Sequence, residues 1–247
     1  MAALAAGVAT SMAQNVYSLN IVGYANVQCD HGFHAYSNPF QVGVSNGANE
    51  IFDNSGGVWN DVQIQEWTGA GYNVTVFSQD TTVTTTGFAN GAGSAQKPVP
   101  ILGMGTAPGS IPGAAKGWLL NNVNASNNIV FVGTVRTGTN SAVIPSGGIQ
   151  AVGSAIPYAG PITSLGFTNT GQLNDIQILE FVSATPTGGG AVGYNVTVWS
   201  QDTTVTTTGF ANGAGSVQKP EPQIRIGEGW LMHNPNAPVA WTQILNP

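Results

Sequence analysis

Side chains of the types that ligate metals cluster at one place in the sequence. Cys29, His31 and His34 fall within six residues, and thiolate and imidazole groups spaced around a turn suit zinc and similar metals. Their counterparts in a second, similar segment of the chain are Pro145, Gly147 and Gln150. A site that only one of two copies carries is not needed by the repeating unit. We therefore expect a turn with incidental histidines and no metal site.

Two patterns typical of catalytic residues also occur. Residues 43–47 read Gly-Val-Ser-Asn-Gly, which matches a nucleophilic serine motif, but that chemistry needs a strand, a sharp turn and a helix, and no helix is expected there. Glu66 and Glu180 occupy equivalent positions of a repeat, and paired carboxylates can cleave a glycoside. Duplication, however, places such residues at equivalent rather than converging sites. We predict no catalytic residue, no cofactor and no enzymatic activity.

Aromatic side chains provide a third kind of candidate site. Trp67, Trp118 and Trp230 could stack on sugars if they are exposed, and surface glycans would then be the partner. The alternative is that the tryptophans fill cores, which the Gly-Trp-Leu context favours for Trp118 and Trp230. Both interpretations stay open at this point.

The composition excludes several classes of protein. The 247 residues include 5 Lys+Arg and 11 Asp+Glu, with a formal net charge of −6. A nucleic-acid-binding protein needs a basic stripe, which five basic residues cannot supply. The hydrophobic fraction of 42% is sufficient for a core, yet no run of about 18 apolar residues occurs, so no transmembrane helix is predicted.

The first 13 residues differ from the rest of the chain. They read MAALAAGVATSMA, an apolar stretch that ends in a small-x-small pattern. Such a stretch is typical of the end of a secretion signal, and the alternative is a short apolar N-terminal arm. We exclude residues 1–13 from the core fold and predict a secreted protein, extracellular or at the cell surface.

An internal repeat organises the remaining chain. Residues 71–100 and 193–222 differ at three positions, and shorter similarities flank them on both sides. The offset between matching elements varies, so insertions fall between elements, where loops tolerate them. The sequence predicts two copies of one unit, at residues 14–132 and 133–247.

The hydrophobic pattern within each copy is that of strands. Residues 72–77 alternate with period two and are rich in β-branched and aromatic side chains, and residues 62–65 alternate likewise. A short connection joins these two runs into a hairpin, and residues 118–120 and 129–132 flank an Asn-rich turn that indicates a second hairpin. We predict an all-β fold of two tandem homologous units, each a β-sandwich or a partly closed β-barrel.

The scarcity of charge points to association between copies. Soluble β-proteins protect open strand edges with lysine, proline and inward charges, but residues 1–96 contain no lysine or arginine. The segments 81–86 and 203–208 are β-prone and uncharged, and the predicted strand 16–22 could add to a neighbouring subunit. The candidate assembly residues are Val16, Tyr17, Leu19, Ile21, Thr82, Val83, Thr84, Thr204, Val205 and Thr206.

Short motifs give the chain a family resemblance. The segment Val16–Tyr24, the Trp67-x-Gly69-x-Gly71-Tyr72 element, the Gly117-Trp118 element and a second copy of the unit follow a signal-like end. In these features the chain resembles uncharacterised secreted, internally duplicated β-rich proteins of verrucomicrobial-type bacteria. The resemblance implies secretion and a duplicated β architecture, but no activity. Together with the charge pattern, it leads us to expect a structural protein that assembles with copies of itself into a filament or surface layer, with a two-site carbohydrate-binding module as the alternative.

Overall fold

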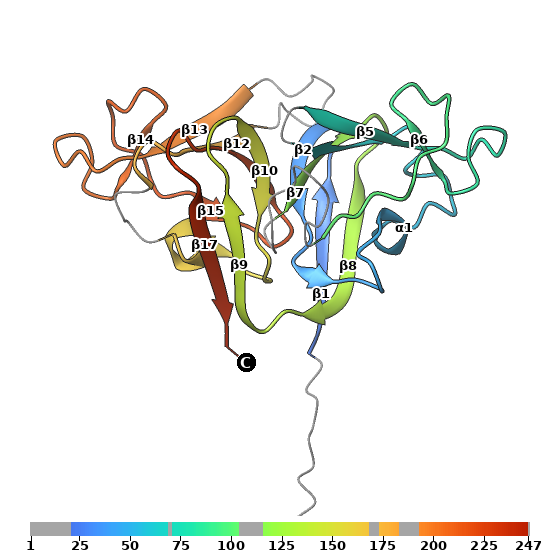
Figure 1. Ribbon diagram of the computed structural model, residues 1–247, viewed down its shortest axis with the longest axis horizontal. Coiled ribbons are helices and arrows are strands. Elements are labelled where there is room, and N and C mark those ends of the chain that lie inside the picture. The colour runs from blue at the N-terminus through green and yellow to red at the C-terminus, as the bar shows by residue number, and fades with distance from the viewer. Residues whose placement is uncertain (1–20, 69–70, 104–115, 168–172, 183–192, 247) are drawn as a thin grey trace, which may run out of the picture.

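The computed structural model describes residues 21–68, 71–103, 116–167, 173–182 and 193–246 (Figure 1). Antiparallel strands dominate these residues, which confirms the predicted all-β class. The elements of the first half are β1 Val22–Cys29, β2 Gly32–Ser37, β3 Phe40–Gln41, α1 Ala48–Ile51, β4 Gln63–Trp67, β5 Tyr72–Phe77, β6 Phe88–Asn90, β7 Gly117–Asn122 and β8 Asn127–Val135. Those of the second half are β9 Gly138–Ile144, β10 Ile149–Gly153, β11 Gly160–Pro161, the 3-10 helix η1 Ile162–Leu165, β12 Gln177–Val182, β13 Gly193–Trp199, β14 Phe210–Asn212, β15 Gln223–Ile224, β16 Gly229–His233 and β17 Val239–Leu245.

Each half contains a five-stranded antiparallel sheet with the same strand order. The order is β2-β7-β4-β5-β6 in the first half and β10-β16-β12-β13-β14 in the second. The hairpin expected from residues 62–77 is present, because β4 pairs with β5 from Gln63 to Trp67. The register is also the same at the Gly-Trp elements, where Trp118 pairs with Tyr36 and Trp230 pairs with Val152.

A smaller group of strands packs beneath each five-stranded sheet. In the first half β8 lies between β1 and β3, and in the second half β17 pairs with β9 along its whole length. Figure 1 shows the two ribbons, β1–β8 and β9–β17, descending from the sheets toward one end of the molecule. Two hydrophobic clusters fill the spaces between ribbon and sheet, one in each half. None of the described sheets closes into a barrel.

The second predicted hairpin is wrong. β7 and β8 follow one another across the Asn-rich turn, but β7 pairs with β2 and β4, whereas β8 pairs with β1 and β3. The buried Asn122 side chain explains the change of sheet, because its amide donates to the carbonyl oxygens of Cys29 and Ala125. The chain therefore crosses from one layer to the other at this turn. The predicted unit boundary between residues 132 and 133 falls inside β8 and stays a prediction.

The threonine segments are turns, which corrects their prediction as assembly strands. Thr82 and Val83 lie in a turn that follows Asp80, and Thr84 is buried directly after this turn. The Asp80 carboxylate accepts both the backbone N–H and the hydroxyl of Thr82, at 2.9 and 2.6 Å. The hydroxyl of Thr84 accepts the N–H of Thr86. Side-chain hydrogen bonds of this kind compete with strand pairing.

The second copy of the segment has the same conformation. Thr204 and Val205 lie in a turn, and Thr206 is buried after it. The Asp202 carboxylate accepts the N–H and the hydroxyl of Thr204 at 2.8 and 2.6 Å. The hydrogen bonds received from threonine lower the pKa of both Asp80 and Asp202. The predicted assembly residues of both segments therefore do not form strand edges.

The N-terminal strand begins later than expected. β1 starts at Val22, and the Ile21 carbonyl just before it accepts the N–H of Val135 at 2.7 Å. The other candidates of this strand, Val16, Tyr17 and Leu19, lie outside the described residues.

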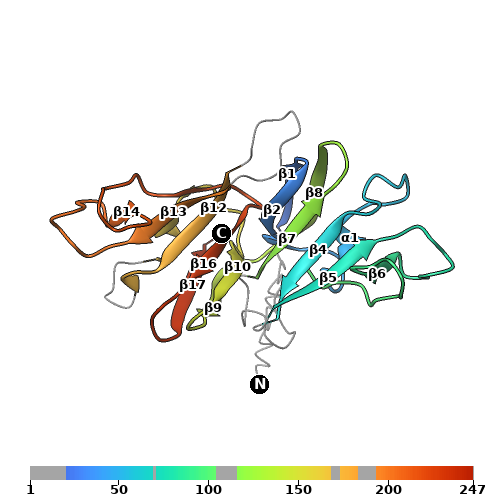
Figure 2. The ribbon, with the colours of Figure 1, turned by 90° about the horizontal axis from the view of Figure 1, so that it is seen from above.

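The two halves contact each other through their five-stranded sheets. Figure 2 shows them side by side, with β2 and β7 next to β10 and β16. A third hydrophobic cluster joins them, formed by Ala35, Leu119, Ala151, Leu179 and Leu231. The interface between the halves is thus a packed apolar layer, and the candidate site lies beside it.

Candidate functional site

A polar groove of about 370 Å³ lies where the two halves meet. β1 supplies Asn26 and Gln28 to one wall, and β2 supplies His34 and Tyr36. The opposite wall comes from the second half, with Phe181 of β12, Glu228 and Gly229 at the start of β16, and Arg225 in the turn before it. The groove exists only when both halves are in place.

Hydrogen bonds fix the wall that the first half contributes. The Tyr36 hydroxyl donates to the backbone carbonyl of Gln28 at 3.3 Å. The Gln28 side chain donates to the Asp30 carboxylate at 2.7 Å, and the Ser126 hydroxyl donates to the same oxygen at 2.9 Å. Burial raises the pKa of Tyr36 far above its ordinary value, so its hydroxyl stays protonated and acts as a donor.

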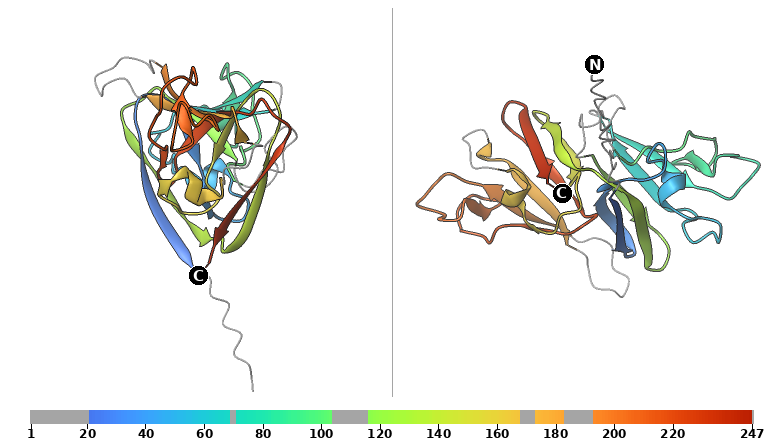
Figure 3. Two further views of the ribbon diagram at one scale, coloured as in Figure 1. Left: turned by 90° about the vertical axis from the view of Figure 1, so that its left-hand side faces the viewer. Right: turned by 90° about the horizontal axis from the view of Figure 1, so that it is seen from below.

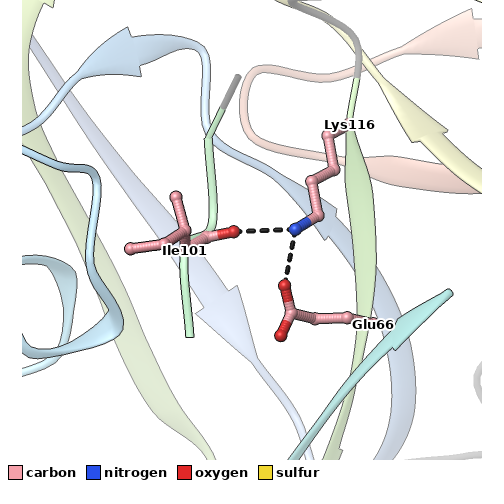
Figure 4. A network of polar contacts seen from close by, with 3 residues as sticks. All are labelled: Glu66, Ile101 and Lys116. Atoms are coloured by element: carbon pink, nitrogen blue, oxygen red, sulfur yellow. Dashed lines mark hydrogen bonds and ion pairs between the residues drawn. The ribbon is translucent and has the colours of Figure 1, made fainter. Parts of the chain in front are cut away.

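The groove contains an acidic side chain at a position where the other half has a lysine. The isolated bridges Lys116↔Val152 and Tyr36↔Glu228 make Lys116 and Glu228 equivalent. In the first half the Lys116 ammonium contacts the Glu66 carboxylate and the carbonyl of Ile101 (Figure 4). In the second half Glu180 accepts a hydrogen bond from Asn195 at 3.0 Å, and the Lys219 ammonium, whose charge acts on Glu180, donates to that same asparagine.

Two carboxyl groups with raised pKa values result from this exchange. Burial raises the pKa of Glu228, and the negative charge of Glu180 adds to the rise, while the Arg225 N–H and guanidinium oppose it. Burial also raises the pKa of Glu180, against the hydrogen bond from Asn195 and the charges of Lys219 and Arg225. The second half thus holds the carboxyl groups of Glu180 and Glu228 near the Arg225 guanidinium, at the position where the first half holds the Lys116–Glu66 ion pair.

Replacing Glu228 with glutamine is expected to stabilise the fold at neutral pH by about 1 kcal/mol, because a buried charge is removed and the Arg225 N–H keeps its acceptor. An acid whose pKa is raised by folding contributes stability at low pH and loses it as the pH rises through the folded pKa. Wild-type stability from this group should therefore fall as the pH rises from 4.5, and the variant should lack that fall. Urea denaturation across this range measures both.

Glu50→Gln provides a control of opposite sign. The Glu50 carboxylate accepts the N–H groups of Val44, Ser45 and Gly47, which lower its pKa to about 2. Its contribution is present at neutral pH and lost as the pH falls, so this variant should be destabilised at pH 7. A Glu228→Gln variant with the wild-type pH dependence would contradict the assignment of the raised pKa.

The metal-type cluster of the sequence does not converge. Cys29 is fully buried in the core, and burial raises the pKa of its thiol to about 11, whereas His34 lines the groove. Burial lowers the pKa of His34, which keeps its imidazole neutral. Among the described residues no three His, Cys, Asp or Glu side chains group where they could hold a metal ion.

The serine motif differs in one respect from expectation. A short helix, α1, does follow residues 43–47, although it has only four residues. The Ser45 hydroxyl donates to the Glu50 carboxylate at 3.0 Å, so the segment forms a cage of donors around that acid. The three histidines of the chain lie elsewhere, at positions 31, 34 and 233. The motif has a local structural role.

Two of the three candidate tryptophans cannot stack on a ligand. Trp118 is fully buried and Trp230 is 1% exposed, because each points into the core beneath its sheet. Trp67 is half-buried and packs edge-to-face on Tyr72 at a centroid distance of 5.1 Å. Its counterpart Phe181 packs in the same way on Tyr194 and also lines the groove. The sequence did not single out Phe181, although its alignment with Trp67 could have done so.

A second feature of this region is the outer edge of β1. In the described sheet β1 is a terminal strand, with β8 on its only paired side. The N–H of Val135 bonds to the carbonyl of Ile21, and hydrogen-bonded pairs alternate along an antiparallel ladder. The backbone groups of Val22, Tyr24 and Asn26 therefore point to the outer edge. This edge runs into the groove, where Asn26 forms part of the wall.

Apolar side chains accompany this edge on the solvent face. Val22 and Tyr24 are 70% and 66% exposed, and the paired strand adds Val130 and Val132 beside them. The β9–β17 ribbon of the second half exposes Val143 and Ile244. None of the five basic residues of the chain lies on β1, β8, β9 or β17. The β1–β8 ribbon therefore combines outward-facing backbone groups on β1 with exposed apolar side chains, and it contains no lysine.

No protein-family model, curated protein or solved structure was found to match the chain. Within the part of the chain that the structure describes, no helix is long and apolar enough to cross a membrane.

Proposed function

We propose that this is a secreted structural protein that assembles through β-strand edges into an extracellular filament or surface layer. The observation that carries the proposal is the outer edge of β1, which pairs with no other described strand and is flanked by exposed Val22 and Tyr24. Exposed edges of this length template pairing with another chain unless charge, proline or a bulge blocks them. Here the edge carries neither lysine nor proline.

We propose the segment before β1 as the added strand. In residues 17–21 the side chains of Tyr17, Leu19 and Ile21 alternate with those of Ser18 and Asn20, and the segment continues directly into β1. Each copy would thus carry both a donor segment and an acceptor edge. Figure 3 places the start of β1 near the end of β17, at the tip of the ribbons. Because β1 starts at this tip, we propose that the preceding segment adds to a neighbour, where backbone hydrogen bonds supply the affinity. Donor and acceptor surfaces that differ generate an open chain of subunits.

The duplication and the secreted location belong to the same proposal. The equal strand order and register of the two five-stranded sheets support two homologous units. The near identity of residues 71–100 and 193–222 supports them as well. A low charge shared by both copies suits packing against other copies, because little electrostatic repulsion keeps them apart.

The Tyr24→Lys variant tests the proposal. Because the Tyr24 side chain is exposed, lysine can replace it without disturbing the pairing of β1 with β8. A charge on an edge strand opposes pairing with a further strand. We expect the critical concentration for assembly to rise at least tenfold, as measured by light scattering and negative-stain microscopy.

A matched control is Val44→Lys, which adds the same charge at a loop residue that is 95% exposed and lies outside both β1 and β8. It should assemble as the wild type does. Circular dichroism establishes that both variants are folded. A wild-type protein that stays monomeric at high concentration would contradict the proposed function, and equal effects of the two lysines would contradict the role of the β1 edge.

Carbohydrate binding is the alternative proposal, now moved from the tryptophans to the groove. Amide groups of Asn26 and Gln28, the carboxylates of Asp30 and Glu228 and the ring of Phe181 line it, and such groups can bind and stack on a sugar. A glycan array with the intact protein tests this alternative, and an array without hits would remove it.

A further inference from the structure

The contacts between the two halves are reciprocal. Tyr36 of the first half forms an isolated bridge with Glu228 of the second, and Val152 of the second forms one with Lys116 of the first. Since Tyr36 corresponds to Val152 and Lys116 to Glu228 in the two sheets, each half presents the same two positions to the other. This is the pattern of a self-complementary, twofold contact.

Close backbone packing repeats with the same reciprocity. A Cβ atom on Gly117 would lie 2.6 Å from the carbonyl oxygen of Val152, and one on Gly229 would lie 2.6 Å from that of Tyr36. The apolar layer between the halves is reciprocal as well, because Ala35 and Leu119 of the first half have Ala151 and Leu231 of the second as their counterparts. The interface is therefore specific to these two surfaces and does not depend on which chain carries them.

The covalent link between the halves is short. β8 ends at Val135 and β9 begins at Gly138, so only residues 136 and 137 connect them. This connection lies at the ribbon tips, whereas the sheets meet at the opposite end of the molecule (Figures 1 and 3). Short connections between two complementary parts favour their exchange between chains.

Arg136 holds the connection in its closed form. Its guanidinium donates to the carbonyl oxygens of Asn38 and Phe40 in the first half, at 3.3 and 2.7 Å, and to that of Ala155 in the second half, at 3.3 Å. Burial lowers its pKa to about 10, which still leaves it charged at neutral pH. The closed chain is thus stabilised by one residue that contacts both halves.

We infer that the two halves exchange between chains, so that the first half of one copy pairs with the second half of another. The partner is a second copy of this chain, and the surface is the one that already joins the halves. This inference deepens the proposed self-assembly by naming a contact between copies, and it rests on that proposal. Each exchanged interface has the contacts of the closed chain, so high protein concentration favours exchange by mass action.

A disulfide engineered across the interface shows whether the two halves that meet there belong to one chain or to two. Bridge partners have Cα atoms about 4.5–5.5 Å apart, within the range that a disulfide spans. Tyr36→Cys and Glu228→Cys are combined in a Cys29→Ala background, so that these are the only two thiols. The protein is assembled at high concentration and oxidised, and its covalent species are separated on a non-reducing denaturing gel. Each single-cysteine variant serves as a control for random crosslinking.

Exchange predicts a ladder of covalent dimers and larger species in the assembled fraction, absent from the single-cysteine controls. Assemblies whose disulfides all lie within one chain would overturn the inference and leave the proposed function intact. A protein that does not assemble would overturn both. If the first pair yields no disulfide even in dilute monomer, Lys116→Cys with Val152→Cys probes the reciprocal bridge. Covalent dimers and larger species again indicate exchange, and disulfides within single chains again overturn the inference.

Discussion

Replacing Lys116 with methionine is expected to destabilise the fold by about 3–5 kcal/mol, because it leaves the Glu66 carboxylate unpaired in a buried setting. The two side chains are 4% and 13% exposed. Methionine retains most of the apolar length of lysine, so loss of packing contributes little. The Ile101 carbonyl, which accepts from the ammonium at 2.8 Å, also loses its donor. Urea denaturation of purified protein measures the change.

Two further variants separate the ion pair from the lysine itself. Lys116→Met combined with Glu66→Gln should recover much of the lost stability, because no buried charge remains without a partner. Lys97→Met should cost only about 1 kcal/mol, since the ammonium of Lys97 bonds to Asn73 and to the carbonyl of Val74 but to no carboxylate. A single Lys116→Met variant no less stable than Lys97→Met would contradict the importance of the pair.

The residue of the second half that corresponds to Lys116 carries the opposite charge. Glu228 occupies the equivalent bridge position, and the carboxylate that corresponds to Glu66 is Glu180. In the second half the Glu180 carboxylate accepts a hydrogen bond from Asn195, and Glu228 lines the groove. A single change of charge at one repeated position thus separates a closed structural contact from a candidate binding site.

Alternation of side chains in the sequence correctly predicted β4 and β5 as strands, and their pairing follows from the short connection. Burial does not alternate along β5, because Thr75, Val76 and Phe77 at its end are all buried. The all-β class follows from the same pattern. The tandem-unit assignment stays a prediction, although the sheets of the two halves share their order and register.

Threonine-rich segments could not be predicted from β-propensity alone. The residues 81–86 have suitable side chains for a strand, but Asp80 precedes them and its carboxylate captures Thr82. Gln96, eleven residues after Thr85, accepts the Thr85 N–H at 2.9 Å and holds the turn from outside. Local hydrogen bonds outweigh a propensity of less than about 1 kcal/mol.

The groove could not be predicted because it needs both halves. Its walls combine Gln28 and Tyr36 with Phe181 and Glu228, residues separated by more than half the chain. Nothing in the local sequence indicates that β2 faces the start of β16. The same is true of Arg136, whose three acceptors belong to both halves. Residue spacing could suggest the repeat, but not the way in which the repeats pack.

Alanine at Gly117 or Gly229 is expected to destabilise the fold by about 3 kcal/mol, through the interface between the halves. At either position the new Cβ would lie 2.6 to 2.8 Å from three backbone atoms of the opposite half, at Val152 or at Tyr36. Backbone atoms cannot rotate away as a flexible side chain can, so the two sheets must move apart. Such a shift also opens the apolar layer around Leu119 and Leu231.

Gly71→Ala provides the matched control for this substitution. A Cβ at Gly71 meets no atom within 4 Å, and its backbone φ is not in the left-handed region. Alanine there should be neutral or slightly stabilising, because it restricts the unfolded chain. Thermal and urea denaturation of the three variants give the comparison.

The reciprocity of the interface sharpens this prediction. Gly117 and Gly229 meet the same three kinds of backbone atom at distances that agree within about 0.1 Å, so their alanine variants should lose nearly equal stability. The double variant should lose less than the sum of the two, because sheets already moved apart by one Cβ accommodate the second. Strictly additive losses would show that the two contacts are independent and would contradict a single rigid interface. Since exchange between chains uses this same interface, both alanines should also weaken any assembly that depends on it.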